Sequence, residues 1–140
     1  MTEFALDARL DADTYSVTDL SLSRVLLMND ARFPWVILVP RRPNCAEWLD
    51  FSSDDQQVLL QEQLRVMAVL QELTGAHKLN VANLGNMVRQ FHLHIIARFE
   101  TDVAWPGPVW GQGAREAYSD AEANAFVSAL QQALRQVFNV

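Results

Sequence analysis

Cysteine, histidine and long apolar runs are all scarce in this chain of 140 residues. The single cysteine, Cys45, excludes an intramolecular disulfide and a cysteine-rich zinc site, and it is typical of a protein of the reducing cytoplasm. The longest apolar runs, such as residues 35–39, have five members, whereas a membrane-spanning helix needs about 20. The N-terminus lacks the positively charged and apolar regions of a signal peptide. We therefore expect neither a membrane segment nor secretion by a standard signal.

Basic charge is also in the minority. The chain has 11 lysines and arginines against 17 acidic residues, and its formal net charge is −6. This balance argues against binding DNA, RNA or anionic lipid over a broad surface, because such binding requires a basic face. Residues 61–100 are the least acidic stretch and contain all three histidines. An anionic small molecule is therefore expected to bind there.

Length and composition predict one globular domain, residues 1–140. Hydrophobic residues make up 50% of the chain and charged residues 20%, which is typical of a folded domain and excludes a disordered polar chain. No repeat, low-complexity tract or linker interrupts the sequence. A chain of this length forms one core and has little room for a second.

Two segments show the three- and four-residue spacing of apolar side chains that predicts amphipathic helices. The first follows N-cap residues at 52–55 and ends at Gly75, which gives about 20 residues. The second follows a capping box formed by Ser119 and Glu122. Residues 4–10 indicate a short helix or an irregular entry.

Short apolar and β-branched segments between turn residues predict strands at residues 17–20, 24–28, 35–39, 78–82 and 90–97. Pro34 and Pro40 flank the third of these, as expected because proline is tolerated at strand ends. Hairpin-like strands around one long helix predict an α+β fold. We expect a mainly antiparallel sheet of about five strands, one long central helix and a C-terminal helix.

Two of the histidines lie in a single predicted strand. Side chains alternate across a strand, so Gln90, His92 and His94 are expected on one face at intervals of about 6.5–7 Å. Phe91 and Leu93 would then point to the core on the other face. This arrangement would line up two imidazoles and an amide on a rigid element.

Three interpretations of this histidine pair are open. The histidines could be half-exposed and satisfied by neighbouring groups, with no chemical role. They could bind a transition metal, although His77 or Asp30 would then have to supply the third ligand from elsewhere. They could instead serve nucleophilic catalysis, with one imidazole attacking an electrophile while the other groups hold an anion.

The wider sequence resembles the histidine triad (HIT) family. Residues 84–98, LGNMVRQFHLHIIAR, are similar to its signature His-φ-His-φ-His-φ-φ, in which φ is apolar and a Gly-Gln element precedes the histidines. Residues 26–30 and 34–41 are similar to the family's upstream strand, which ends in Val-x-Pro-Lys/Arg, and the predicted long helix falls between the two blocks. The resemblance covers roughly residues 17–100, which we take as the domain core, with residues 101–140 as a C-terminal arm and helix. Residues 102–111 resemble a bacterial branch of HIT-like hydrolases.

The sequence departs from the family pattern at four places. Gln90 stands where the first triad histidine usually sits, Asn86 replaces the usual glutamine, and Trp35 replaces a common histidine. The loop at residues 80–85 is also shorter than the family's glycine-rich loop. These departures bear on substrate range and rate more than on fold.

The resemblance implies a role for each matching position. His92 matches the nucleophile towards an α-phosphorus, which in the family is oriented by the main-chain carbonyl at the first triad position. His94 matches the histidine that contacts the phosphate, while Gln90 could donate a hydrogen bond but cannot exchange a proton as imidazole does. Catalytic roles are thus expected for His92, His94 and Gln90, and substrate contacts for Asn29, Asp30, Gly85, Asn86, Met87 and Arg98.

By this resemblance, the protein would hydrolyse nucleoside phosphoramidates or dinucleoside polyphosphates at the α-phosphate through a nucleotidyl-histidine intermediate, with no cofactor or metal. The alternative is a non-catalytic nucleotide-binding protein with a degenerate triad. The expected partners are a small-molecule nucleotide and a second copy of the chain in a cytoplasmic homodimer, with no nucleic acid and no membrane. Residues 105–110, which hold two of the four tryptophans, form either a loop packed on its own core or an arm that reaches the nucleotide pocket or a second subunit. We favour the arm.

Overall fold

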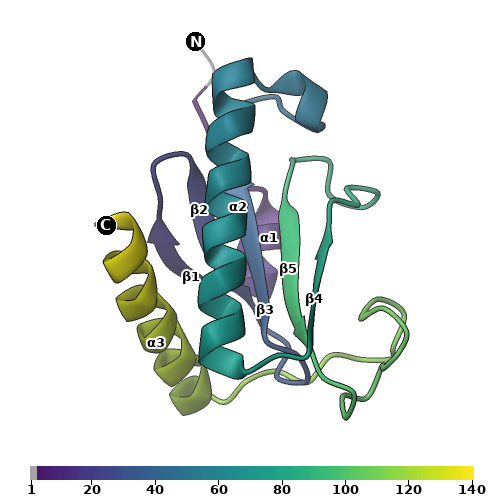
Figure 1. The fold of residues 1–140 in the computed structure, drawn as a ribbon. Helices are drawn as coiled ribbons and strands as arrows, with labels where there is room; N and C mark the ends of the chain where they lie inside the picture. Colours follow the sequence, from purple (N-terminus) through teal and green to yellow (C-terminus); the bar gives the residue numbers. More distant parts are fainter. Residues whose placement is uncertain (1–2) are drawn as a thin grey trace.

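The computed structural model describes residues 3–140, and its centre is one antiparallel sheet of five strands (Figure 1). The strand order across the sheet is β1-β2-β3-β5-β4. The predicted α+β architecture is confirmed, including the long central helix and the C-terminal helix. The strands are β1 (Thr14–Asp19), β2 (Ser23–Met28), β3 (Trp35–Pro40), β4 (Lys78–Ala82) and β5 (Leu93–Arg98), and the helices are α1 (Ala8–Asp13), η1 (Trp48–Asp50), α2 (Ser53–Thr74) and α3 (Asp120–Phe138).

Local capping signals fix the ends of the two long helices. At the start of α2, the Ser52 side chain accepts a hydrogen bond from the Asp55 amide. The helix ends at Gly75, whose φ of +70° lies in the left-handed region that glycine adopts without strain. Ser119 caps α3 in the same way, accepting from the Glu122 amide. Both predicted helices are therefore confirmed, and α2 runs for 22 residues.

The two faces of the sheet are covered differently. Figure 1 shows α2 and α3 side by side on one face, with α1 behind the sheet on the other. Leu59 and Leu70 of α2 and Leu130 of α3 belong to the larger core cluster, which fills the first face. The second face carries a smaller cluster that includes Leu10 of α1 and Trp35 of β3. Among residues 3–140, no helix combines the length and hydrophobicity needed to cross a bilayer.

Three of the predicted elements have shifted ends. The first strand is longer than expected because pairing with β2 extends it back to Thr14, opposite Met28. The entry helix begins at Ala8 rather than near residue 4, after Asp7 caps its first turn. The strand predicted from residue 90 begins only at Leu93. Residues 90–92 instead form long-range contacts that a paired strand would not make.

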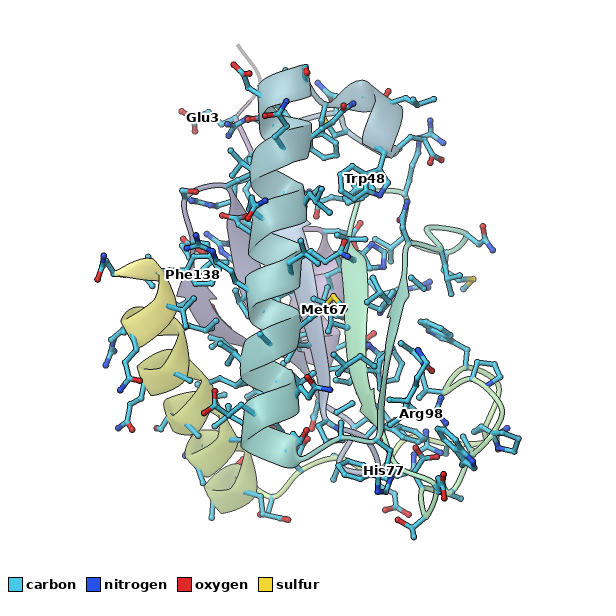
Figure 2. All side chains as sticks on the ribbon, viewed as in Figure 1. Glu3, Trp48, Met67, His77, Arg98 and Phe138 are labelled. Atoms are coloured by element: carbon cyan, nitrogen blue, oxygen red, sulfur yellow. The ribbon has the colours of Figure 1, made fainter. Side chains whose placement is uncertain are left out.

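The segment after β5 is organised around one buried ion pair. The Arg98 guanidinium donates to the Asp102 carboxylate over 2.8 Å, and both side chains are almost fully buried. Figure 2 shows Arg98 at the base of the loop that leaves the sheet. Its remaining N–H groups reach Asn80 Oδ1 and the Gly107 carbonyl. The loop is thereby fastened to the sheet, and this carries Trp110 back towards β3.

Candidate active site

His92 and His94 lie together on the face of the sheet away from α2. Their ring centroids are 4.8 Å apart, and each side chain is only 5% exposed. His94 stands in β5 between its register partners Ile37 of β3 and Ala82 of β4, so the sheet holds it on both sides. His92 immediately precedes the strand. The predicted pairing of these two imidazoles on one side of a rigid element is thus present in the structure.

A main-chain contact fixes which nitrogen of the His92 ring carries a proton. Its Nδ1 lies 2.7 Å from the carbonyl oxygen of Gln90. A carbonyl oxygen can only accept, so Nδ1 carries the proton and Nε2 keeps its lone pair. The neutral ring is therefore oriented as a nucleophile would need to be.

The His94 ring is held in the opposite tautomer. The indole Nε1–H of Trp35 donates to His94 Nδ1 over 3.0 Å, so the ring proton of neutral His94 must sit on Nε2. Burial, together with the neighbouring His92, lowers the pKa of His94 to about 3. His94 is therefore a neutral hydrogen-bond donor at physiological pH, and Trp35 occupies a role that an acceptor side chain could not fill.

A cavity of about 580 Å³ opens beside these histidines. The two imidazoles and the loop before β5 contribute to its lining, and the rings of Trp35 and Trp110 lie directly beside His94. The volume falls within the usual range for small-molecule sites. Its lining comprises Arg9, Leu10, Asp13, Met28, Trp35, Leu84, Gly85, Asn86, Met87, Val88, His92, His94 and Trp110.

Comparison with known proteins places this site in a family. The model of the HIT domain matches residues 9–101. The chain belongs to the histidine triad family. Members of this family bind nucleotides, and most of them are nucleotide hydrolases.

Bacterial HIT proteins of known structure are similar over nearly the whole chain. A histidine triad protein from Bradyrhizobium japonicum is 46% identical with a TM-score of 0.91, covering 94% of this chain and 98% of its own. One from Marinobacter aquaeolei is 44% identical with a TM-score of 0.94, covering 96% and 98%. The diadenosine triphosphate hydrolase of Plasmodium falciparum is 16% identical with a TM-score of 0.63, covering 97% and 85%, and shares the fold. The comparison with curated proteins found no match.

Three of the residues predicted to contact substrate lie in the loop that precedes the triad segment of this HIT protein. Gly85, Asn86 and Met87 all line the cavity. Gly85 has a φ of +68°, a left-handed conformation that suits glycine, and this turn brings the loop past the histidines. Met87 is 80% exposed, so a bound ligand could cover it.

The Gln90 side chain does not line the cavity, because it is turned to the chain segment that leads into α1. Its amide oxygen accepts from the Asp7 amide and its amide nitrogen donates to the Ala5 carbonyl, each over 2.8 Å. The Phe91 amide nearby donates to the Cys45 carbonyl. Residues 90–92 make these contacts in place of pairing in the sheet. Gln90 contacts the His92 ring through its main-chain carbonyl and not through its side chain.

Three predicted substrate-binding residues lie outside the cavity lining. The Asn29 side chain accepts from the Tyr118 amide, and the Asp30 carboxylate is paired with Arg32 over 2.8 Å. Arg98 is occupied by its ion pair with the loop after β5. Each of these polar groups has a structural partner, so we assign them to holding the arm of residues 99–119 and do not include them in the proposed phosphate site.

The sequence did not point to the α1 side of the cavity. Arg9, Leu10 and Asp13 line it, although no pattern in the sequence linked residues 8–13 to the histidines. Trp110 was anticipated in part, since its segment was expected to reach a nucleotide pocket. Its ring lies 5.0 Å from His94 and 5.7 Å from Trp35, centroid to centroid, within the same chain.

Neither Cys45 nor His77 belongs to this cavity. Burial raises the pKa of the Cys45 thiol, which makes it a poorer nucleophile. His77 lies beyond the C-terminal end of α2, where its Nδ1 accepts from the Glu100 amide (Figure 2). Within residues 3–140, no cluster of three or more His, Cys, Asp or Glu side chains is placed to hold a metal ion.

Proposed function

We propose that this HIT protein hydrolyses nucleotides at the α-phosphate, with His92 as the nucleophile. The observation that carries the proposal is the pair of opposite tautomers: His92 offers a lone pair on Nε2, and His94 offers a proton on Nε2. The first is what attack on phosphorus requires, and the second is what a phosphoryl oxygen needs as it gains charge. The substrates we propose are dinucleoside polyphosphates or nucleoside phosphoramidates.

In the first step, His92 Nε2 forms a bond to the α-phosphorus while the bond from phosphorus to the leaving group breaks. The leaving group takes that electron pair, and an amine leaving group takes up a proton from solvent as it departs. The ring becomes a cation that still carries its Nδ1 proton. The Gln90 carbonyl, 2.7 Å away, stabilises that charge. In this proposal His94 donates to the phosphoryl oxygens, together with main-chain N–H groups of residues 85–88, which line the cavity.

In the second step, water attacks the phosphorus of the nucleotidyl-histidine and the N–P bond breaks. The electron pair returns to His92 Nε2, a nucleoside monophosphate leaves, and the attacking water releases one proton to solvent. One displacement is thereby divided into two, and the ring returns to its starting tautomer. No cofactor is needed in either step.

The second candidate is a nucleotide-binding protein without turnover. It is favoured by Gln90, because an amide at the first triad position cannot exchange a proton. The walls of Trp35 and Trp110 would hold a base in either case. The two candidates differ only in whether a covalent intermediate forms.

A panel of diadenosine polyphosphates and adenosine phosphoramidates tests the proposal. Wild type should release adenosine monophosphate, and His92→Ala should lower kcat by at least about 10³-fold. Acid quenching of wild type should trap a nucleotidyl adduct on His92, which His92→Ala should lack. The control is His77→Ala, which leaves the cavity intact. Binding of adenosine monophosphate with no adduct and no turnover would favour the second candidate.

We also propose that the protein acts as a homodimer in the cytoplasm. The family resemblance supports the dimer, and the free Cys45 supports a reducing compartment. Sedimentation equilibrium checks the assembly: a mass near twice 15.8 kDa is expected, and a monomer at micromolar concentration would contradict it.

A further inference from the structure

The side chain of Gln90 joins two parts of the chain that are far apart in sequence. Its amide makes one hydrogen bond to the Ala5 carbonyl and one from the Asp7 amide, across separations of 85 and 83 residues. The two bonds satisfy an acceptor and a donor on the segment that leads directly into α1. An imidazole offers one donor and one acceptor at opposite sides of a ring, so it could not make this side-by-side pair as an amide does.

This contact fixes where α1 sits. Asp7, whose amide is held by Gln90, also caps the helix by accepting from the amides of Arg9 and Leu10. Leu10 is buried in the core cluster on the cavity side of the sheet. The helix is therefore placed by a polar clamp at its start and an apolar contact within its first turns. Together they form one wall of the cavity.

That wall carries the positive charge of Arg9, which is not paired with an acidic side chain of residues 3–140. Arg9 and Asp13 are the charged side chains in the cavity lining. Asp13 is paired with Arg115 over 3.2 Å, which offsets its charge. The Arg9 guanidinium is exposed and forms no hydrogen bond or ion pair with any other residue of the described part, 3–140. In a chain of net charge −6, this cation at the cavity has no partner among residues 3–140.

We infer that Gln90 is a positioning residue that holds α1 over the cavity, and that Arg9 on this helix binds the anionic leaving group of the substrate. The inference rests on the proposed function and deepens it, because it selects between the two substrate classes. A leaving group that carries phosphates gains a charge-assisted contact with Arg9, whereas the uncharged amine of a phosphoramidate does not. The protein is thus a hydrolase of nucleoside polyphosphates in preference to phosphoramidates.

The test compares kcat/KM for diadenosine triphosphate with kcat/KM for adenosine 5′-phosphoramidate. Arg9→Gln should lower the first by about 10-fold, mainly through KM, and leave the second within about twofold. Arg135→Gln is the charge-matched control, since Arg135 lies on α3 on the opposite face of the sheet and should change neither value. Equal losses on both substrates in Arg9→Gln, or no loss on either, would overturn the role of Arg9.

The clamp is tested separately by amide hydrogen exchange. Gln90→Ala keeps the carbonyl that orients His92 but removes both side-chain hydrogen bonds, so the amides of residues 8–13 should exchange faster. Phe4 and Leu6 still pack on the cavity-side cluster, so α1 should loosen without detaching. The same variant should lose part of the preference for diadenosine triphosphate, and Gln90→Glu, which keeps only the acceptor, should lie between. Unchanged exchange in Gln90→Ala would overturn the clamp.

The outcomes separate this inference from the function on which it rests. A wild type that turns over neither substrate would overturn the hydrolase proposal and the assignment of a leaving group to Arg9 together. A wild type that turns over both substrates, with a ratio that Arg9→Gln does not alter, would overturn the present inference alone.

Discussion

The indole of Trp35 donates its Nε1 hydrogen to Nδ1 of His94 over 3.0 Å, from β3 to the neighbouring strand β5. The two rings lie at a centroid distance of 5.6 Å, and both side chains are 5% exposed. Because this is the hydrogen bond that the indole makes within residues 3–140, the contact decides which nitrogen of His94 carries the proton. A residue outside the triad thus sets the chemistry of one inside it.

Removing that donor should impair turnover more than binding. Trp35→Phe keeps an aromatic ring but leaves His94 free to carry its proton on either nitrogen, so we expect kcat to fall by about 10-fold. Nitrogen NMR of the imidazole should report a mixed tautomer in place of a proton on Nε2. Trp48→Phe is the matched control, since Trp48 packs against Phe91 at the other face. An unchanged tautomer in Trp35→Phe would contradict this account.

The buried His94 should make stability depend on pH. Its pKa falls from 6.5 to about 3 on folding. Between these values His94 is protonated in the unfolded chain but stays neutral in the folded protein. The stabilisation is therefore complete above pH 6.5 and is lost as the pH falls towards 3, at up to about 1.4 kcal/mol per pH unit.

Urea unfolding between pH 7 and pH 5 measures this slope. His94→Gln should lose the steepest part of it, whereas His77→Gln, which alters an exposed histidine, should follow the wild type. The interval above pH 5 is chosen because carboxylates do not yet titrate there. Equal slopes in wild type and His94→Gln would contradict the lowered pKa.

The ion pair at the base of the arm should be worth far more than those on the surface. Hydrogen bonding from Arg98 lowers the pKa of Asp102 to about 2, and the carboxylate also accepts from the amides of Phe99 and Ala104. Asp102→Asn should lower the free energy of unfolding by about 3–5 kcal/mol because it leaves Arg98 buried without its counter-charge. Asp19→Asn, which breaks an exposed pair with Arg24, should cost less than about 1 kcal/mol. Similar losses in the two variants would refute the distinction.

A buried carboxylate on α2 should anchor the turn between β1 and β2. Glu62 is 2% exposed, and its two oxygens accept from the Leu22 and Ser23 amides and from the Ser21 hydroxyl. Glu62→Gln places an N–H group against a donor, so we expect a loss of about 1–3 kcal/mol in chemical denaturation. Glu72→Gln, at an exposed position on the same helix, should be nearly neutral. A neutral Glu62→Gln would show that the turn does not depend on this carboxylate.

The parts of the fold that the sequence predicted well depend on local chemistry. Ser52, Gly75 and Ser119 specify helix ends through contacts within one turn, so their pattern is visible in the chain itself. Strand alternation predicted the Gln90 side chain beside the two histidines, but it gave no sign that this side chain is bound to the segment before α1 and lies outside the cavity lining. Its hydrogen-bond partners, Ala5 and Asp7, are more than 80 residues away in the sequence. No pattern of neighbouring residues predicts a contact at that separation. Trp110 is similar, since its approach to His94 depends on how Arg98 anchors the intervening loop.

The alternation of side chains along β5 has a consequence for changing this protein by design. Leu93 and Ile95 belong to the core under α2, while His94 and Ile96 belong to the opposite side of the same strand. Neighbouring residues of β5 therefore have separate roles: one set stabilises the core, and the other forms the active-site face. Random mutagenesis of the whole strand would confound the two, whereas libraries restricted to odd or to even positions could tune heat resistance and selectivity independently.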